Sequence, residues 1–221
     1  MSKVRSIAGV VLAGGGARRM FPHSPTGGDK ALAVLGTQPL IAHVVARLAP
    51  QVPRLIINAN GDPQRYARLG LEVVPDAGEP DQGPLAGLLA AMIWAQRTAP
   101  DVDAIVTVST DTPFLPFDLV QRLAGEAADG PAVAASFERV HPVIGLWPLG
   151  LRASLECALA QQRRSVEKFA RQHDAVAVGF EPITIGGLAV DPFFNANTPE
   201  DLAQAHTLLA LNSPTKDKAH G

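Results

Sequence analysis

The chain has 221 residues, 47% of them hydrophobic, and a formal net charge of −2 at pH 7, values typical of one α/β domain with a full core. The near-balanced charge argues against nucleic acid or a membrane as the main partner, because such binding normally needs a basic face. The single cysteine, Cys157, excludes an internal disulfide and a cysteine-based zinc cluster, and the apolar pattern around it favours a buried, inert thiol.

The first motif lies where the first apolar run ends. Residues 10–12 (VVL) form this run, and it stops at the glycines 14–16. An apolar run bounded by glycine is typical of a buried parallel strand. Glycine also lets the backbone turn with positive φ and bring its N–H groups close to a ligand. Since Arg18, Arg19 and Lys30 follow, the stretch predicts a strand-to-loop site for a polyphosphate.

Two well-known phosphate loops do not fit this stretch. A Walker loop needs Ser or Thr after its lysine to hold the metal, but Lys30 is followed by Ala31. The Rossmann fingerprint needs a third glycine for close helix packing, and Arg19 stands at that position. A third kind of phosphate loop is therefore expected.

Further along the chain, segments with strand patterns alternate with segments that have helical spacing. Such alternation implies right-handed crossovers and a doubly wound, mostly parallel sheet with helices on both faces, a three-layer α/β fold. We expect helices over 39–48, 63–69, 83–94, 149–160, 165–173 and 199–211. Strands are expected over 55–57, 71–74, 104–108, 132–137, 143–147 and 175–180. His141-Pro142 is expected at the turn between the strands 132–137 and 143–147 or just before the second of them.

One domain is expected to span residues 1–211, because no repeat or low-complexity linker divides the chain. Residues 212–221 are polar and lack periodicity, so we expect a disordered tail. No stretch has the pattern of a signal peptide, and no apolar run approaches the ~20 residues of a membrane helix, so we expect a cytoplasmic protein.

Four polar loops are expected to meet at one edge of the sheet. Leu12, Asn58, Asp76 and Asp111 each fall at the carboxyl end of an expected strand. Ligands of open parallel sheets bind outside these ends. The sequence therefore predicts one crevice lined by all four loops.

The motifs in this order closely resemble the signature of the molybdenum cofactor guanylyltransferase family, the nucleotidyltransferases that act on molybdopterin. The resemblance implies a Rossmann-like nucleotidyltransferase fold, Mg²⁺, and transfer of GMP from GTP to the terminal phosphate of molybdenum-bearing molybdopterin with release of pyrophosphate. It also implies molybdenum insertion proteins and acceptor molybdoenzymes as partners. The matching motifs are Leu12-Ala13-Gly14-Gly15, Arg19-Met20, Asp29-Lys30, Asn58-Ala59-Asn60, Gly83 to Gly87, Asp111-Thr112-Pro113, His141-Pro142 and Asn195-x-Asn197-Thr198-Pro199-Glu200.

Charged side chains in these motifs would act on the phosphates and the metal. Nucleotidyl transfer builds negative charge on the α-phosphate and the departing pyrophosphate, and Arg19 and Lys30 would stabilise it. Asp111 is well placed to hold Mg²⁺, which bridges phosphate oxygens through one or two carboxylates. Because one carboxylate alone would hold the ion weakly, we expect Asn195 or Asn197 as a second contributor.

The remaining motif residues would bind the nucleoside and the pterin. Asn58 and Asp76 are expected at the nucleoside, where a carboxylate can accept from two ribose hydroxyls or from the N1–H and N2–H of guanine. His141 is expected to bind the pterin phosphate or to pack, because an attacking phosphate is already ionised and needs no base. The expected GTP-binding set is Leu12, Ala13, Gly14, Gly15, Lys30, Asn58, Asp76, Gly83, Pro84, Leu85 and Asp111, and the expected pterin side comprises His141, Asn195 and Asn197.

The chain departs from the family pattern in one loop. Phe21 stands where the family usually has glycine, and residues 22–28 lengthen the loop. Phenylalanine does not adopt positive φ without cost, so we expect the loop to depart from the family's usual path over the triphosphate, with Asp29-Lys30 still at the phosphates. Its Gly27-Gly28 pair fits either a lid hinge or a disordered insertion.

Three other functions compete with guanylyl transfer. Cytidylyl transfer to the same acceptor is the nearest, although cytidylyl relatives tend to carry Ala-Ala-Gly where this chain has Ala13-Gly14-Gly15. A sugar-nucleotide pyrophosphorylase is a weaker alternative. A nucleotide-binding adaptor without catalysis is opposed by the presence of Lys30 and Asp111.

Overall fold

The structure is a computed structural model of the chain, and it describes residues 6–14, 20, 28–78 and 82–212. The predictions for Gly15, Arg18, Arg19, the loop residues 21–27 and the tail residues 213–221 lie outside these residues.

A seven-stranded sheet forms the middle layer, and its strand order is β5-β4-β1-β6-β8-β7-β9. Only β8 runs antiparallel to its neighbours, so the sheet is mixed but mostly parallel, as predicted. The strands are β1 (Ile7–Leu12), β4 (Arg54–Asn58), β5 (Glu72–Val74), β6 (Ala104–Ser109), β7 (Ala132–Ser136), β8 (Arg139–Pro148) and β9 (Val176–Gly179).

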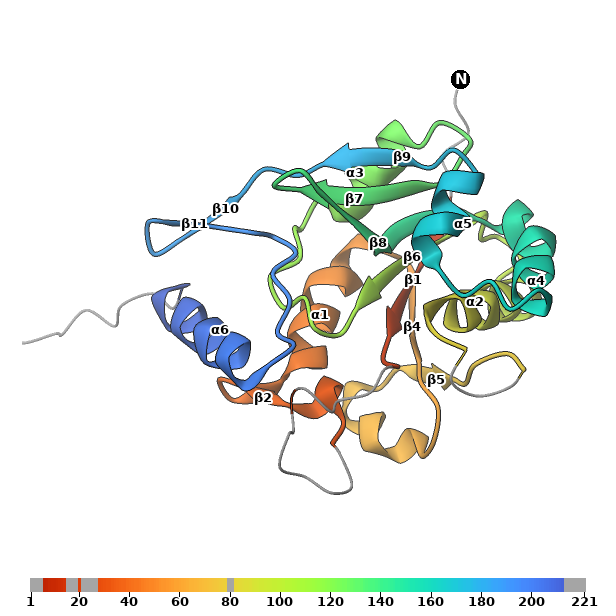
Figure 1. Cartoon of the computed structure of the whole chain (residues 1–221). Helices are drawn as coiled ribbons and strands as arrows, with labels where there is room; N and C mark the ends of the chain where they lie inside the picture. Colours follow the sequence, from red (N-terminus) through yellow and green to blue (C-terminus); the bar gives the residue numbers. More distant parts are fainter. Residues whose placement is uncertain (1–5, 15–19, 21–27, 79–81, 213–221) are drawn as a thin grey trace, which may run out of the picture.

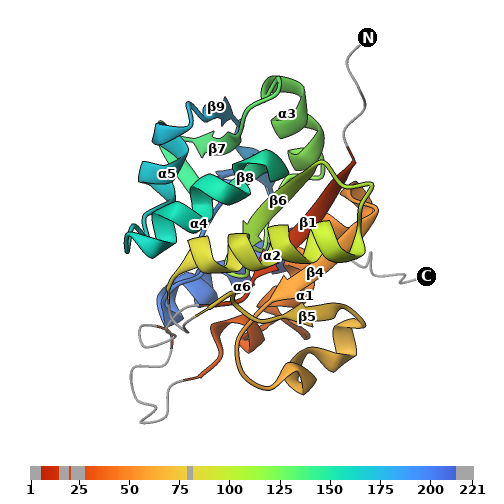
Figure 2. The same cartoon turned by 90° about the vertical axis from the view of Figure 1, so that its right-hand side faces the viewer.

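Helices cover both faces of this sheet (Figures 1 and 2). On one face, α2 (Pro84–Thr98), α4 (Arg152–Ala160) and α5 (Val166–Gln172) pack on side chains of the central strands. On the other face lie α1 (Leu40–Leu48) and α3 (Leu119–Glu126). Every residue of β1 is buried, which is the pattern of a parallel strand between two helical layers.

A smaller hydrophobic cluster lies outside the main sheet. It joins α6 (Pro199–Asn212) to two short hairpins, β2 (Val34–Leu35) with β3 (Gln38–Pro39) and β10 (Ile183–Ile185) with β11 (Leu188–Val190). Figure 1 shows α6 beside β2, although the sequence separates them by most of the chain. As expected from the sequence, Thr198 caps α6, since its Oγ1 accepts the backbone N–H of Asp201 at 3.1 Å.

Two sequence expectations need correction in the second half of the chain. His141 and Pro142 lie within β8 rather than at a turn, because β7 and β8 are joined by Phe137 and Glu138 alone, both at positive φ (46° and 59°). Such turns usually carry Asn or Gly, so the sequence has no local signal for this one. Cys157 is exposed rather than buried, because Leu155 and Ala158 occupy the packed face of α4.

Several short elements were not anticipated. The helix α3 and both hairpins were not predicted, and the first turn expected in α4 is a 3-10 helix, η5 (Leu149–Leu151). Two more short helices that were not predicted are η2 (Lys30–Leu32) and η3 (Ala49–Gln51). The short helix expected over 63–69 is present as the 3-10 helix η4 (Pro63–Leu69). Within the described part of the chain, no helix has the length and hydropathy needed to cross a membrane.

Candidate active site

The site centres on Lys30 and Asp111, which are 81 residues apart in the chain and in direct contact in the fold. The Lys30 Nζ atom lies 2.5 Å from Oδ2 of Asp111. Asp111 follows β6, and Lys30 is the first residue of η2, whose N-cap is Asp29. The sequence hypothesis required both side chains at one rim of the sheet, and the structure places them there.

Asp111 has one carboxylate oxygen that no group in the described part of the chain satisfies. The residue is buried, at 6% exposure, and its Oδ1 has no hydrogen-bond partner among the described residues. Its loop is held by a hydrogen bond from Ala196 N–H to the Asp111 carbonyl at 2.9 Å. An orphaned buried acceptor is costly. Oδ1 therefore fits the oxygen-ligand preference of a hard divalent cation.

Of the two asparagines expected near the metal, the structure brings one to the Lys30–Asp111 pair. Lys30 Nζ donates to Oδ1 of Asn197 at 2.8 Å. The Asn195 amide instead donates to the carbonyl of Phe193 at 3.1 Å and closes its own turn. Among the described residues, no group of three His, Cys, Asp or Glu side chains could hold a metal ion. Of the two asparagines, Asn197 is therefore the one whose side-chain oxygen contacts the Lys30–Asp111 pair.

Asn58 and Asp76 form a second polar group at the ends of β4 and β5. The Asn58 Nδ2 donates to the Val74 carbonyl at 3.1 Å and to Asp76 Oδ1 at 3.0 Å, which uses both of its hydrogens. The other Asp76 oxygen accepts from Asn60 Nδ2 at 2.8 Å, and Asn60 Oδ1 accepts the Asp76 N–H at 2.9 Å. The Asp76 carboxylate is therefore fixed in orientation and keeps lone pairs for a ligand.

Glycines shape the approach to this group. Gly83 has a φ of +79° at the N-cap of α2, so Pro84 can begin the helix. A Cβ on Gly87 would lie 2.1 Å from Asn58 Oδ1 and 2.9 Å from Leu12 Cδ2, so only glycine fits there. Leu85, at the second position of α2, is fully buried.

The end of β1 completes this edge. The N–H of Ala13 donates to the Asn58 carbonyl at 2.8 Å, which ties the first loop to the second. Gly14 is exposed, and a Cβ there would have no atom of the described residues within 4 Å. Leu12 is buried at the last position of β1. The described members of the expected GTP-binding set therefore lie along the carboxyl edge of β1, β4, β5 and β6 and at the start of α2.

His141 belongs to a buried chain of hydrogen bonds. Ser136 Oγ donates to Asp191 Oδ1 at 2.7 Å, so Ser136 accepts from His141 Nε2 at 2.8 Å, which makes Nε2 the protonated nitrogen. The His141 ring packs on Phe193 with ring centroids 4.9 Å apart. Burial lowers the pKa of His141, partly opposed by the charge of Asp191. His141 is therefore a neutral, fixed side chain near neutral pH.

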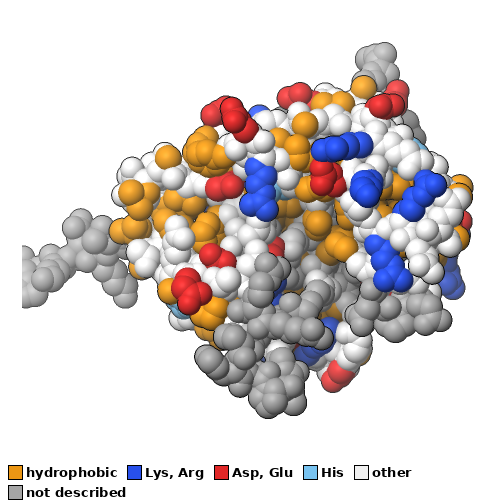
Figure 3. Space-filling view, in the orientation of Figure 1, with side chains coloured by type: hydrophobic (Ala, Val, Ile, Leu, Met, Phe, Trp, Pro, Cys, Tyr) orange, Lys and Arg blue, Asp and Glu red, His pale blue; other side chains and the backbone are white. Residues whose placement is uncertain are grey.

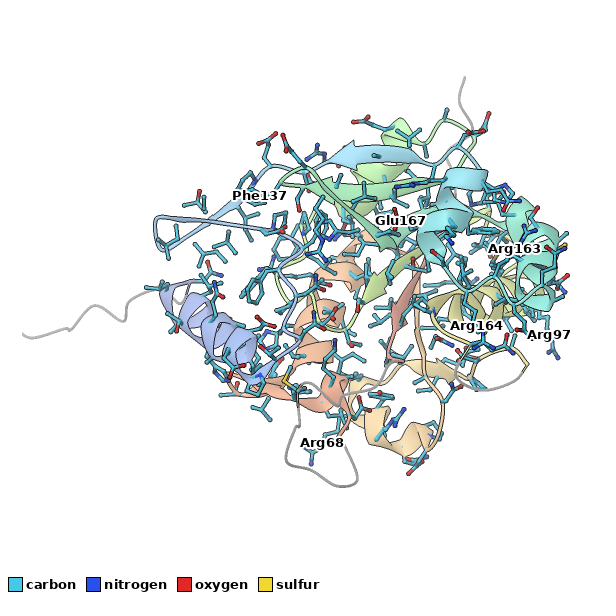
Figure 4. The ribbon with its side chains drawn as sticks, viewed as in Figure 1. Arg68, Arg97, Phe137, Arg163, Arg164 and Glu167 are labelled. Carbon is cyan, nitrogen blue, oxygen red and sulfur yellow. The ribbon has the colours of Figure 1, made fainter. Side chains whose placement is uncertain are left out.

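Residues that sequence reasoning did not propose also border the site. A pocket of about 260 Å³ lies between Leu85 and the α4–α5 connection, where Arg163, Arg164 and Lys168 line it. Figure 3 shows Lys and Arg side chains gathered over α4 and α5, and Figure 4 places Arg163 and Arg164 there. The adjacent pair Arg163-Arg164 was the sequence feature that could have indicated this pocket, but two neighbouring arginines alone are typical of ordinary surface charge.

Comparison with known proteins gives concordant matches. The family model described as MobA-like NTP transferase domain matches residues 9–176. A curated relative from Mesorhizobium japonicum, named molybdenum cofactor guanylyltransferase, is 47% identical over 209 residues, which cover 93% of this chain and 97% of the relative.

Two solved structures share the fold. Molybdopterin-guanine dinucleotide biosynthesis protein A from Archaeoglobus fulgidus has a TM-score of 0.67 at 22% identity, covering 92% of this chain and 98% of that chain. Rv0371c from Mycobacterium tuberculosis, in complex with manganese, has a TM-score of 0.62 at 15% identity, covering 93% and 100%.

Proposed function

The chain belongs to the MobA-like NTP transferase family, and from this premise we propose that it transfers GMP from GTP to the terminal phosphate of molybdopterin carrying molybdenum. The products are the guanine dinucleotide form of the cofactor and pyrophosphate. The observation that carries the proposal is the contact of Lys30 with Asp111 beside an orphaned carboxylate oxygen, at the sheet edge where Asp76 follows β5. This arrangement offers a cation, a metal ligand and a nucleoside acceptor along one nucleotide.

The transfer needs positive charge more than it needs a base. A terminal phosphate oxygen of molybdopterin attacks the α-phosphorus of GTP, the new P–O bond forms, and the bond from the α-phosphorus to the bridging oxygen of pyrophosphate breaks. Lys30 stabilises the charge that builds on the phosphates, and Arg19 is proposed to share this role. No proton has to be removed from the attacking group, because it is ionised at neutral pH.

We propose that Asp111 Oδ1 holds a divalent cation, with Mg²⁺ as the expected ion and Asn197 as the neutral second contributor. When bound, such an ion would neutralise the triphosphate charge and help to align it for in-line attack. Asp111 Oδ2 stays on Lys30, so one carboxylate keeps the lysine and the ion beside the same phosphates.

At the nucleoside end, Asp76 is the residue proposed to recognise the nucleoside. Its two oxygens each accept one amide hydrogen, from Asn58 and Asn60, and each has a lone pair left. A pair of N–H or O–H donors on the nucleoside fits such a carboxylate. Asn58 acts on the nucleoside by holding Asp76.

The pterin is proposed to bind on the side formed by His141, Asn195 and Asn197. The stretch 191–197 carries this side, because Asp191 ends the hydrogen-bond chain of His141 and Asn197 contacts Lys30. Molybdenum insertion proteins and acceptor molybdoenzymes are the proposed partners on this side, and the cytoplasm is the proposed location.

The test is nucleotide turnover with and without molybdenum-loaded molybdopterin. GTP consumption and pyrophosphate release are expected only when the acceptor is present, and EDTA should abolish them until Mg²⁺ is added. CTP and GTP are compared side by side, and sugar phosphates are offered as alternative acceptors. A clear preference for CTP, or turnover with a sugar phosphate instead of molybdopterin, would overturn the assignment.

A further inference from the structure

The short helix η4 (Pro63–Leu69) contacts Asp29, the residue before Lys30, and Asn60, which holds Asp76. It lies beside the loop that carries Lys30, below the sheet in the view of Figure 1. Its contacts are made by two neighbouring residues, Arg65 and Tyr66. Arg65 is exposed and Tyr66 is buried.

Tyr66 anchors the residue before Lys30. Its ring is buried at 1% exposure in the same core cluster as Ala31, and its hydroxyl donates to Asp29 Oδ2 at 2.7 Å. The other Asp29 oxygen accepts the N–H of Ala31 at 2.9 Å and caps η2. Asp29 therefore faces η4 and its own helix, and its contacts set the position from which Lys30 reaches Asp111.

Arg65 joins this anchor to the nucleoside end of the site. Its Nε lies 3.3 Å from Asp29 Oδ2, and its Nη2 donates to the Asn60 carbonyl at 2.5 Å. Its guanidinium carbon also lies 4.8 Å from the centre of the Tyr66 ring. Asn60 in turn clamps Asp76 through two hydrogen bonds. A planar guanidinium can hold two acceptors in fixed directions, which a lysine in its place could not do.

From these contacts we infer that Arg65 and Tyr66 are positioning residues for the nucleotide: through Asp29 they place Lys30 at the phosphates, and through Asn60 Arg65 places Asp76 at the nucleoside. This inference rests on the proposed function. The phosphate end and the nucleoside end thus share one support, the side chain of Arg65.

The experiment measures the phosphate end and the nucleoside end of the site separately, by comparing GTP with ligands that lack one part of it. Calorimetry on the full chain with Mg²⁺ gives dissociation constants for GTP, GMP and inorganic tripolyphosphate. The ratio Kd(GMP)/Kd(GTP) reports the contribution of the β- and γ-phosphates. The ratio Kd(tripolyphosphate)/Kd(GTP) reports the contribution of the nucleoside. A general loss of stability changes neither ratio selectively.

Each variant has its own expected pattern. Tyr66→Phe should lower Kd(GMP)/Kd(GTP) about five- to tenfold and leave Kd(tripolyphosphate)/Kd(GTP) unchanged. Asn60→Ala should lower Kd(tripolyphosphate)/Kd(GTP) and leave Kd(GMP)/Kd(GTP) unchanged. Arg65→Ala should lower both ratios. The matched control is Arg68→Ala, on the same helix, because Arg68 is exposed, has no polar contact among the described residues, and lies at the outer surface (Figure 4).

The outcomes distinguish this inference from the proposed function. If the wild-type chain does not bind GTP, the proposed function falls and this inference with it. If the wild type binds GTP but Arg65→Ala changes the ratios no more than Arg68→Ala does, the positioning role is refuted while the function stands. Should Tyr66→Phe fail to fold, Arg65→Ala decides alone, since its side chain is 31% exposed.

Discussion

Replacing Gly87 with alanine tests how tightly α2 packs against the nucleoside end of the site. A methyl group at this position would lie 2.1 Å from Asn58 Oδ1 and 2.9 Å from Leu12 Cδ2, well inside contact distance. Asn58 cannot simply move away, because its Nδ2 is held by the Val74 carbonyl and by Asp76. The substitution must therefore shift α2 or break the hydrogen bonds that orient Asp76.

The size of the effect follows from three contributions. Overpacking costs about 1–3 kcal/mol. Loss of the Asn58 hydrogen bonds costs about 0.5–1.5 kcal/mol each. Alanine in a helix interior gains about 1 kcal/mol over glycine. A net loss of about 1–5 kcal/mol lowers the melting temperature of a domain of this size by roughly 2–20 °C.

The assay is thermal unfolding followed by circular dichroism, with GTP titration of the folded variant. Gly125→Ala is the matched control, because Gly125 also lies in a helix, α3, and a Cβ there would meet nothing within 4 Å. Gly125→Ala should leave the melting temperature unchanged or raise it, while Gly87→Ala lowers it and weakens GTP binding about tenfold or more. Equal shifts of the same sign in both variants would refute the reasoning.

Three further predictions concern charges in the site. Asp111→Asn should reduce turnover about 100-fold or more with an unchanged circular dichroism spectrum, because the metal ligand loses its charge, and retained activity would remove the metal assignment. Lys30→Ala should lower the melting temperature, since Asp111 is left buried and unpaired, and Mg²⁺ should restore part of that loss; no response to Mg²⁺ would contradict the shared site. Burial lowers the pKa of His141 below 6.5, so the folded state binds the proton more weakly than the unfolded state and stability falls as pH drops from about 6.5 through the lowered pKa. His141→Gln should lose less stability than the wild type between pH 7 and pH 5, measured as the change in melting temperature. Identical pH dependences of the melting temperature in the two proteins would contradict the prediction.

The strand–helix alternation, the mostly parallel sheet and the meeting of Lys30 with Asp111 could be predicted without coordinates. Apolar periodicity is local, and it marks which segments are buried strands and which are amphipathic helices. Right-handed crossovers then bring the carboxyl ends of parallel strands to the same edge. For this reason, residues at strand ends could be assigned to one site from their sequence position.

Other features were decided only by the tertiary structure. Asn60 was part of a recognised motif, yet its clamp on Asp76 depends on the register of β4 against β5. The burial of Tyr66 against the Lys30 loop likewise depends on how η4 packs against η2. Cys157 is exposed because the turn of α4 directs other residues to the core.

Local apolar patterns were enough to predict the layers of the fold and the sheet edge at which the reactive side chains gather, because each pattern depends on residues only a few positions apart in the chain. The tertiary structure alone decided which polar side chains hold one another and where only glycine fits. These contacts join residues that are distant in the chain. Whether they form depends on atomic positions to within about an ångström, and a local sequence pattern does not specify those positions.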